Sequence, residues 1–338
     1  MNQATTVISI CFFLITFLSG SLFSGVGTES MQFLKIKPSA RAASLGDSFV
    51  SIANDVNATF YNPAGLAQLD NTEISLMHMV YIQDTGYEFG TVVFPMGDKL
   101  RIGAYVIFMN YGSIARTLEN GSGMLVAGTE SYAPYDLSTA VSVGYKLSKN
   151  ISLGANIKIA YSDIDGNKLS GLMGDAGLLI KLTEETSLGG VVYNVGSAIN
   201  GSTVPMLVKG GLSTSFSLAE QNDLLLGVGA NYISASAKLS GSIGLEYNYQ
   251  NIFFVRTGYG MASEADGINI GAGVKQDLGG MTGMLDYNFS LMGDLGSAHR
   301  VSVGIKFGEE YPGKSKRKSS NVKSKNGNSG IRNYYKPR

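Results

Sequence analysis

Residues 41–69 read RAASLGDSFVSIANDVNATFYNPAGLAQL, and the rest of the chain is organised around this stretch. It is rich in small residues, and after the N-terminal region it is the only long stretch that does not alternate like a β-strand. Pro63 fixes its own φ and disfavours a helical Asn62, while Gly65 permits a tight or left-handed backbone. The stretch therefore predicts a compact segment that folds into a confined space and is locked by a turn.

The composition of the chain favours a membrane barrel around that segment. The 338 residues are enough for two soluble domains or one large barrel. Charged residues make up only 15% of them, whereas about a quarter is usual. A soluble protein with so few charges would struggle to cover its surface, but the outer face of a membrane barrel must be apolar.

The two ends of the chain have compositions of their own. We expect residues 1–28 to be a signal peptide, because the apolar run at 7–23 is followed by small residues. A transmembrane anchor is the alternative, but small residues interrupt the run before it reaches about 20 apolar residues. Residues 309–338 form a basic tail that we expect to be disordered, with nine Lys/Arg and no Asp/Glu from Tyr311 onward. The tail is either simply solvated or an arm for peptidoglycan, anionic lipid or an acidic partner.

Alternation of period two continues through residues 73–308. Apolar residues lie on one side of each run and Gly, Ser, Asn or an occasional Lys on the other, as in 151–161 and 299–307. This pattern is typical of half-buried strands, and most runs are as long as the 9–11 residues of a tilted membrane strand. Fourteen strands are predicted, near 73–83, 86–96, 99–110, 135–147, 151–163, 172–182, 186–195, 205–217, 223–234, 238–249, 252–261, 266–277, 281–292 and 299–307.

The connections between these runs alternate between short and mostly longer ones, which is the asymmetry of an outer-membrane barrel. The longest, 111–134, is interpreted as an outer loop, and its glycine-rich part as flexible. A soluble sandwich or propeller would also alternate, but its polar faces would carry many charges. The predicted fold is therefore all-β, a 14-stranded antiparallel transmembrane β-barrel over 73–308, in the bacterial outer membrane and in contact with its lipid.

The motif residues within and around 41–69 resemble those of the PorV/PorQ family, which is related to FadL-type outer-membrane transporters. The residues that carry this resemblance are Arg41, Gly46, Asn54, Asp55, Asn62, Pro63, Ala64 and Gly65. The resemblance implies that the N-terminal segment, 29–72, is a hatch inside the barrel lumen. It also implies two functions. The first is binding or passage of a hydrophobic or amphipathic small molecule, towards which we lean. The alternative is an accessory role in type IX protein secretion, with cargo or envelope proteins as partners.

Basic residues are expected on the inward side of several strands. They are Arg101, Lys146, Lys158, Lys181, Lys275 and Lys306, and all but Lys158 lie beside a short turn. They either neutralise hatch acids, with Asp47 and Asp55 as candidates, or attract an anionic head group, and we favour the former. Inward glycines such as Gly154 either leave room for a bulky ligand or allow close hatch packing.

Catalysis, cofactors and metals are not expected. The chain has two histidines, His78 and His299, and His299 is interpreted as an interfacial side chain rather than an acid–base catalyst. The one cysteine, Cys11, lies in the expected signal peptide, so no metal cluster is predicted. We also expect no nucleic-acid partner.

Overall fold

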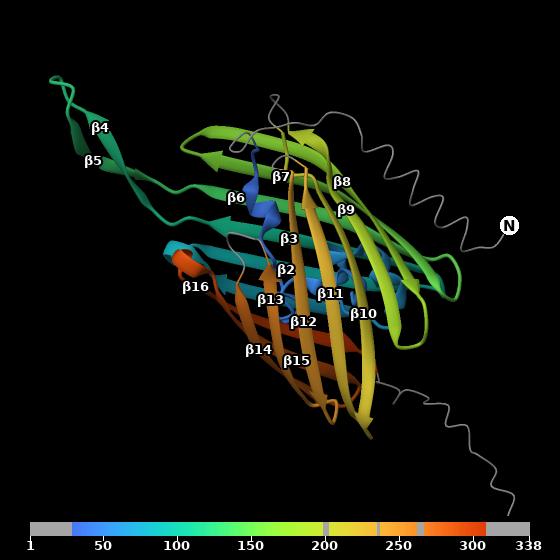
Figure 1. Ribbon diagram of the computed structural model, residues 1–338. Coiled ribbons are helices and arrows are strands. Elements are labelled where there is room, and N and C mark those ends of the chain that lie inside the picture. The colour runs from blue at the N-terminus through green and yellow to red at the C-terminus, as the bar shows by residue number, and fades with distance from the viewer. Residues whose placement is uncertain (1–28, 199–202, 235–236, 262–266, 309–338) are drawn as a thin grey trace, which may run out of the picture.

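The computed structural model describes residues 29–198, 203–234, 237–261 and 267–308. The expected signal peptide and basic tail lie outside these ranges. Within them, fourteen antiparallel strands form a closed barrel in which β1 pairs with β16 (Figure 1). The predicted all-β fold of a 14-stranded antiparallel barrel is thereby confirmed.

The barrel strands agree closely with the predicted runs. They are β1 (Glu73–Val80), β2 (Gly86–Met96), β3 (Leu100–Asn110), β6 (Tyr135–Lys146), β7 (Ile151–Ile164), β8 (Asn167–Lys181), β9 (Thr186–Ala198), β10 (Leu207–Ala219), β11 (Asn222–Ile233), β12 (Lys238–Tyr249), β13 (Phe253–Met261), β14 (Ile268–Asp277), β15 (Met281–Leu291) and β16 (Ser297–Phe307). Along β1 buried and exposed residues alternate strictly, so the apolar face seen in the sequence points outward. Large hydrophobic side chains such as Leu76, Ile157 and Val255 are exposed on that outer face.

A long two-stranded ribbon lies outside the barrel. Strands β4 (Ile114–Glu119) and β5 (Leu125–Tyr132) pair only with each other and project away from the wall (Figure 1). The interpretation of residues 111–134 as a loop without strands was therefore wrong. Its alternation is short and interrupted, but Asn120 accepts hydrogen bonds from the amides of Ser122 and Met124 and closes a tight turn between the two strands.

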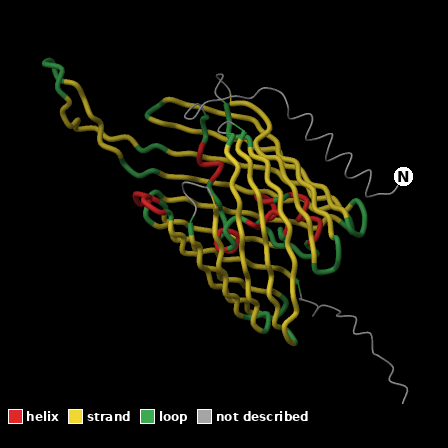
Figure 2. The backbone as a smooth tube through the Cα atoms, viewed as in Figure 1, coloured by secondary structure: helices red, strands yellow, loops and turns green. Residues whose placement is uncertain are grey.

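Residues 29–72 form short helical turns that are enclosed by the strands (Figure 2). These are the 3₁₀ turns η1 (Gln32–Lys35), η2 (Ser48–Ser51) and η3 (Pro63–Gln68), and the short helices α2 (Ala40–Ser44) and α3 (Ala58–Tyr61). Two further 3₁₀ turns, η4 (Ile82–Asp84) and η5 (Gly293–Leu295), lie in connections between barrel strands. No helix among the described residues is both long and apolar enough to cross a membrane.

Candidate functional site

The N-terminal segment contacts the barrel wall at glycines. A Cβ atom placed on Gly154 would lie 2.1 Å from the amide nitrogen of Ala64, and one on Gly258 would lie 2.2 Å from that of Gly46. A Cβ on Gly244 would lie 2.4 Å from the carbonyl oxygen of Leu45. Because these distances are shorter than any real contact of a side chain, only glycine fits. Of the two explanations for inward glycines, this geometry favours close packing of the segment at these positions.

The turn at Asn62 is held from several sides. The Asn62 side-chain oxygen accepts a hydrogen bond from the amide of Ala64 at 3.1 Å, as an N-cap does. The side-chain nitrogen of Asn62, Nδ2, donates to the carbonyl of Val50 at 2.8 Å and to that of Leu178 on β8 at 3.2 Å. A Cβ on Gly65 would lie 2.2 Å from the carbonyl oxygen of Ala53. The Asn-Pro-Ala-Gly motif therefore folds the segment on itself and fixes it to the wall.

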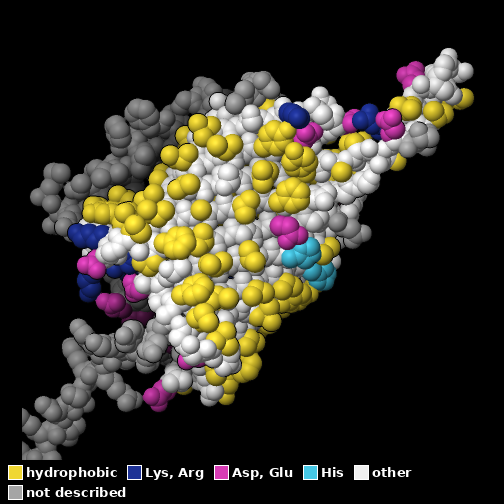
Figure 3. Space-filling model, turned by 180° about the vertical axis from the view of Figure 1, so that it is seen from behind, with side chains coloured by type: hydrophobic (Ala, Val, Ile, Leu, Met, Phe, Trp, Pro, Cys, Tyr) yellow, Lys and Arg dark blue, Asp and Glu magenta, His cyan; other side chains and the backbone are white. Residues whose placement is uncertain are grey.

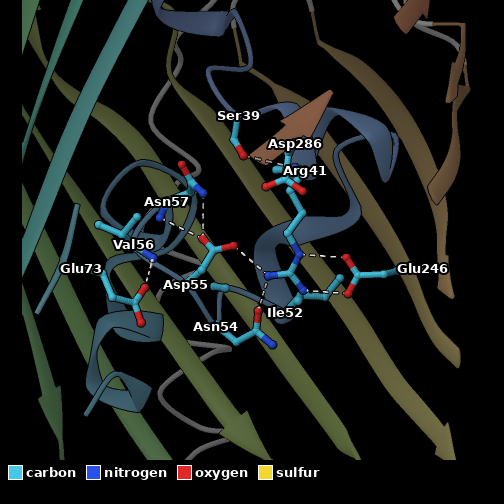
Figure 4. A network of polar contacts seen from close by, with 12 residues as sticks. Ser39, Arg41, Ile52, Asn54, Asp55, Val56, Asn57, Glu73, Glu246 and Asp286 are labelled. Carbon is cyan, nitrogen blue, oxygen red and sulfur yellow. Dashed lines mark hydrogen bonds and ion pairs between the residues drawn. The ribbon is translucent and has the colours of Figure 1, made fainter. Parts of the chain in front are cut away.

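Arg41 is the centre of a partly buried ionic network that joins α2 and residues 54–55 of the N-terminal segment to the wall (Figure 4). Its Nε and Nη2 donate to the two carboxylate oxygens of Glu246 on β12, at 2.8 and 2.9 Å. Its Nη1 donates to Asp55 and to the side-chain oxygen of Asn54, each at 2.7 Å. Burial disfavours the charge of Arg41, but the carboxylates of Glu246 and Asp55 outweigh this effect and raise the pKa of Arg41. Three residues of the sequence motif are thus brought to one point.

The network continues along the wall. Arg256 on β13 binds Glu246 at 2.5 Å and Asp286 on β15 at 2.6 Å, so Glu246 lies between two guanidinium groups. On the other side, Glu73 of β1 accepts a hydrogen bond from the amide of Val56 at 3.0 Å. The segment is therefore connected to strands on both sides of the place where β1 and β16 close the barrel.

A second buried network lies at a β-bulge. The register between β8 and β9 shifts at Gly174/Ala176, and both Tyr193 and Asn194 are buried. Asp175, opposite the bulge, accepts from the amide of Asn194 at 2.8 Å and pairs with Lys158 at 2.7 Å. Lys209 of β10 pairs with Asp47 of the segment at 2.6 Å, and the Tyr193 ring lies within cation–π distance of both lysines.

The predicted basic residues face inward but lie in different surroundings. Arg101 and Lys158 are buried, whereas four are only partly buried; these are Lys146, Lys181, Lys275 and Lys306. Arg101 pairs with Asp70 at 3.2 Å and Lys306 approaches Glu73 at 3.9 Å. Asp47 and Asp55, the two acids expected to pair with these basic residues, have other partners. Asp47 binds Lys209 and Asp55 binds Arg41. That pairing expectation was therefore wrong in its partners, although the principle of charge pairing holds.

Sequence reasoning missed Lys209, Glu246, Arg256 and Asp286. A signal for them was present, since each is a charge on the small-residue side of a strand. Their partners follow only from the register between strands that are far apart in the sequence.

An apolar cluster fills the interior beside these networks. The Phe60 ring packs edge to face on Tyr61 at 5.2 Å, on Phe89 at 6.2 Å and on Tyr105 at 5.8 Å. Several methionines belong to the same cluster, and so does Phe33 of η1. Burial raises the pKa of the Tyr61 phenol well above its usual value, so Tyr61 is neutral. The interior therefore offers apolar surface as well as paired charges.

These features define a closed barrel whose interior holds its own N-terminal segment. The chain belongs to UPF0164, an uncharacterised protein family, which it matches over residues 19–308. No curated protein sequence matches it.

Solved structures share the fold at low sequence identity. The toluene transporter TbuX of Ralstonia pickettii is 13% identical, with a TM-score of 0.55 and 79% of this chain and 97% of that chain covered. The toluene transporter TodX of Pseudomonas putida is 14% identical, with a TM-score of 0.55 and coverage of 85% and 99%. The CymD monoaromatic hydrocarbon channel is 13% identical, with a TM-score of 0.53 and coverage of 81% and 98%. At such identities the similarity concerns the fold.

Proposed function

We propose that this protein is an outer-membrane channel that binds and passes a hydrophobic or amphipathic small molecule, with residues 29–72 as the hatch of the barrel. The observation that carries the proposal is the enclosed segment, which combines fixed backbone contacts at glycines with an apolar aromatic cluster. The similar solved structures are named as toluene transporters and a hydrocarbon channel, which supports this class of ligand. The exposed apolar outer face suits contact with lipid.

In this proposal the two kinds of interior surface have different tasks. The paired charges around Arg41 and Asp47 hold the hatch, because each carboxylate already has a cationic partner. The cluster around Phe60 is packed closed in this structure, so in this proposal a shift of the hatch opens the path, and the cluster lines it for an apolar molecule. The proposed role of the basic residues is retention of the hatch rather than attraction of an anionic head group.

A disulfide lock tests the proposal directly. A Cβ on Gly227 of β11 would lie 2.7 Å from Oγ of Ser48, close to the distance that a disulfide requires between Cβ and the opposite sulfur. We expect the Ser48→Cys/Gly227→Cys variant to lose most uptake of labelled toluene by whole cells when oxidised and to regain it on reduction. The two single variants serve as matched controls. Equal uptake in the oxidised, reduced and empty-vector cells would contradict a channel function.

The ribbon favours a second candidate function, an accessory role in protein secretion like that of PorV/PorQ proteins. It extends beyond the wall and exposes Leu118, Met124 and Leu125. Exposed apolar side chains of this kind suit a protein partner. Recovery of stoichiometric envelope partners with the full-length chain, but not after removal of the ribbon, would favour this function over transport.

A further inference from the structure

A small polar cluster interrupts the apolar outer face of the barrel (Figure 3). The two histidines of the chain are His78 on β1 and His299 on β16, and both side chains point outward. Residue 80 of β1 is paired with His299, so His78 and His299 are diagonal neighbours on the same face of adjacent strands. Such neighbours lie within reach of long side chains, and the histidine side chains gather beside an acidic one in Figure 3.

Each imidazole is oriented through its Nδ1 atom. His78 Nδ1 lies 2.6 Å from a carboxylate oxygen of Glu88 on β2, and His299 Nδ1 lies 2.8 Å from the phenol oxygen of Tyr287 on β15. The ring of His299 also packs against Phe289, with centroids 5.1 Å apart. A carboxylate on Nδ1 stabilises the tautomer that carries its proton there, which leaves the lone pair on Nε2. The carboxylate thus leaves Nε2 of His78 available on the outer surface. The phenol of Tyr287 can accept the Nδ1 proton of His299 in the same way, and in that tautomer Nε2 of His299 is available too.

We propose that His78 and His299 bind one transition-metal dication, such as Zn²⁺ or Cu²⁺, through their Nε2 atoms. Imidazole is a preferred ligand of these ions. A hydrogen bond from Nδ1 to an oxygen atom is the outer-shell arrangement that orients metal-bound histidines. Glu88 and Tyr287 are positioning residues in this site. His78 and His299 each lie two residues from the end of their strand, so the site is at the rim of the wall, where water can fill the remaining coordination positions. Among the described residues, no group of three or more His, Cys, Asp or Glu forms a metal cluster, so this site has two protein ligands.

The surroundings make the pair suited to a cation rather than an anion. Glu88 contributes a negative charge, and the neighbouring outward residues, Leu76, Val80 and Val301, are exposed and apolar. No basic side chain lies next to His78 or His299 in the outward rows of β1, β2, β15 and β16. The cluster is on the outside of the barrel, so the site is separate from the proposed channel.

Titration of the purified, untagged full-length barrel in detergent with Zn²⁺ and, separately, Cu²⁺ tests the site. Calorimetry of the chelator-treated protein is expected to give one ion per chain, and His78→Ala or His299→Ala to weaken binding at least tenfold. Glu88→Gln is expected to weaken binding by roughly 10–100-fold, as outer-shell changes do. The matched control is Glu184→Gln, an exposed carboxylate in the turn between β8 and β9, which should leave affinity unchanged.

Migration of the unheated barrel on a gel checks that each variant is folded. Absence of binding of either ion to the wild-type protein would overturn the proposal. So would equal binding by the His78→Ala/His299→Ala double variant. Uptake by the channel is not measured here, so failure of this test leaves the proposed function untouched.

Discussion

Replacement of Arg41 by methionine tests whether the ionic network holds the N-terminal segment. Methionine keeps much of the apolar stem but removes the hydrogen bonds to Glu246, Asp55 and Asn54. Breaking a buried pair by removing one partner costs about 3–5 kcal/mol. Because Arg41 and Asp55 are only partly buried and Glu246 retains Arg256 at 2.5 Å, we expect a value at the lower end of this range. Since about 1.4 kcal/mol is a factor of ten, local opening of the segment should increase at least roughly a hundredfold.

Hydrogen exchange with mass spectrometry, on the folded barrel in detergent, measures this opening for the amides of residues 39–69. The matched control is Arg116→Met, because Arg116 of the ribbon pairs with Asp165 and Glu130 at a more exposed site. Such exposed pairs contribute about 0–1 kcal/mol, so exchange within 39–69 should not change. If Arg41→Met and Arg116→Met gave the same exchange rates there, the network would not be what retains the segment.

The remaining predictions concern the wall, the second network and the ribbon. Gly154→Ala should destabilise the barrel by about 1–3 kcal/mol in a urea titration, because its Cβ overlaps the turn at Pro63. Gly190→Ala should change the stability little, because its Cβ would meet only the carbonyl oxygen of Lys209, at an ordinary contact distance of 3.9 Å. Lys158→Met should cost about 3–5 kcal/mol, and adding Asp175→Asn should recover part of this; no recovery would argue against a charge effect. Replacement of the ribbon by a short turn should leave the melting temperature of the barrel within a few degrees, and a collapse of the fold would refute its independence.

Much of the fold could be predicted because each strand carries its own signal. The alternation in 151–161 marks an inward and an outward side without knowledge of any neighbour, and the repeated pattern defines a barrel. The ribbon was missed because its apolar residues face no enclosed core. The bulge at Tyr193 and Asn194 was missed because it depends on Asp175 in the preceding strand, β8.

Of the candidate site, the residues of the N-terminal segment could be predicted from the sequence, but their partners on the barrel wall could not. The residues of the segment that matter are close together in the sequence, so Arg41, Asn54, Asp55 and the Asn62 turn were recognisable as a group. Their partners are chosen by strand register, and Arg41 meets Glu246 from 205 positions away. A sequence pattern can show that Glu246 faces inward. Which inward charge Arg41 binds depends on the course of the N-terminal segment through the barrel.

The glycines that face the N-terminal segment also determine what the wall would be without it. Glycine in a strand packs no side chain and weakens it, and here such positions recur on many strands at the level of the segment. A barrel emptied of residues 39–69 would have lost the scaffold that keeps these strands in shape. Removal of the segment is thus expected to give a barrel whose cross-section is easily deformed, and not a wide and stable pore.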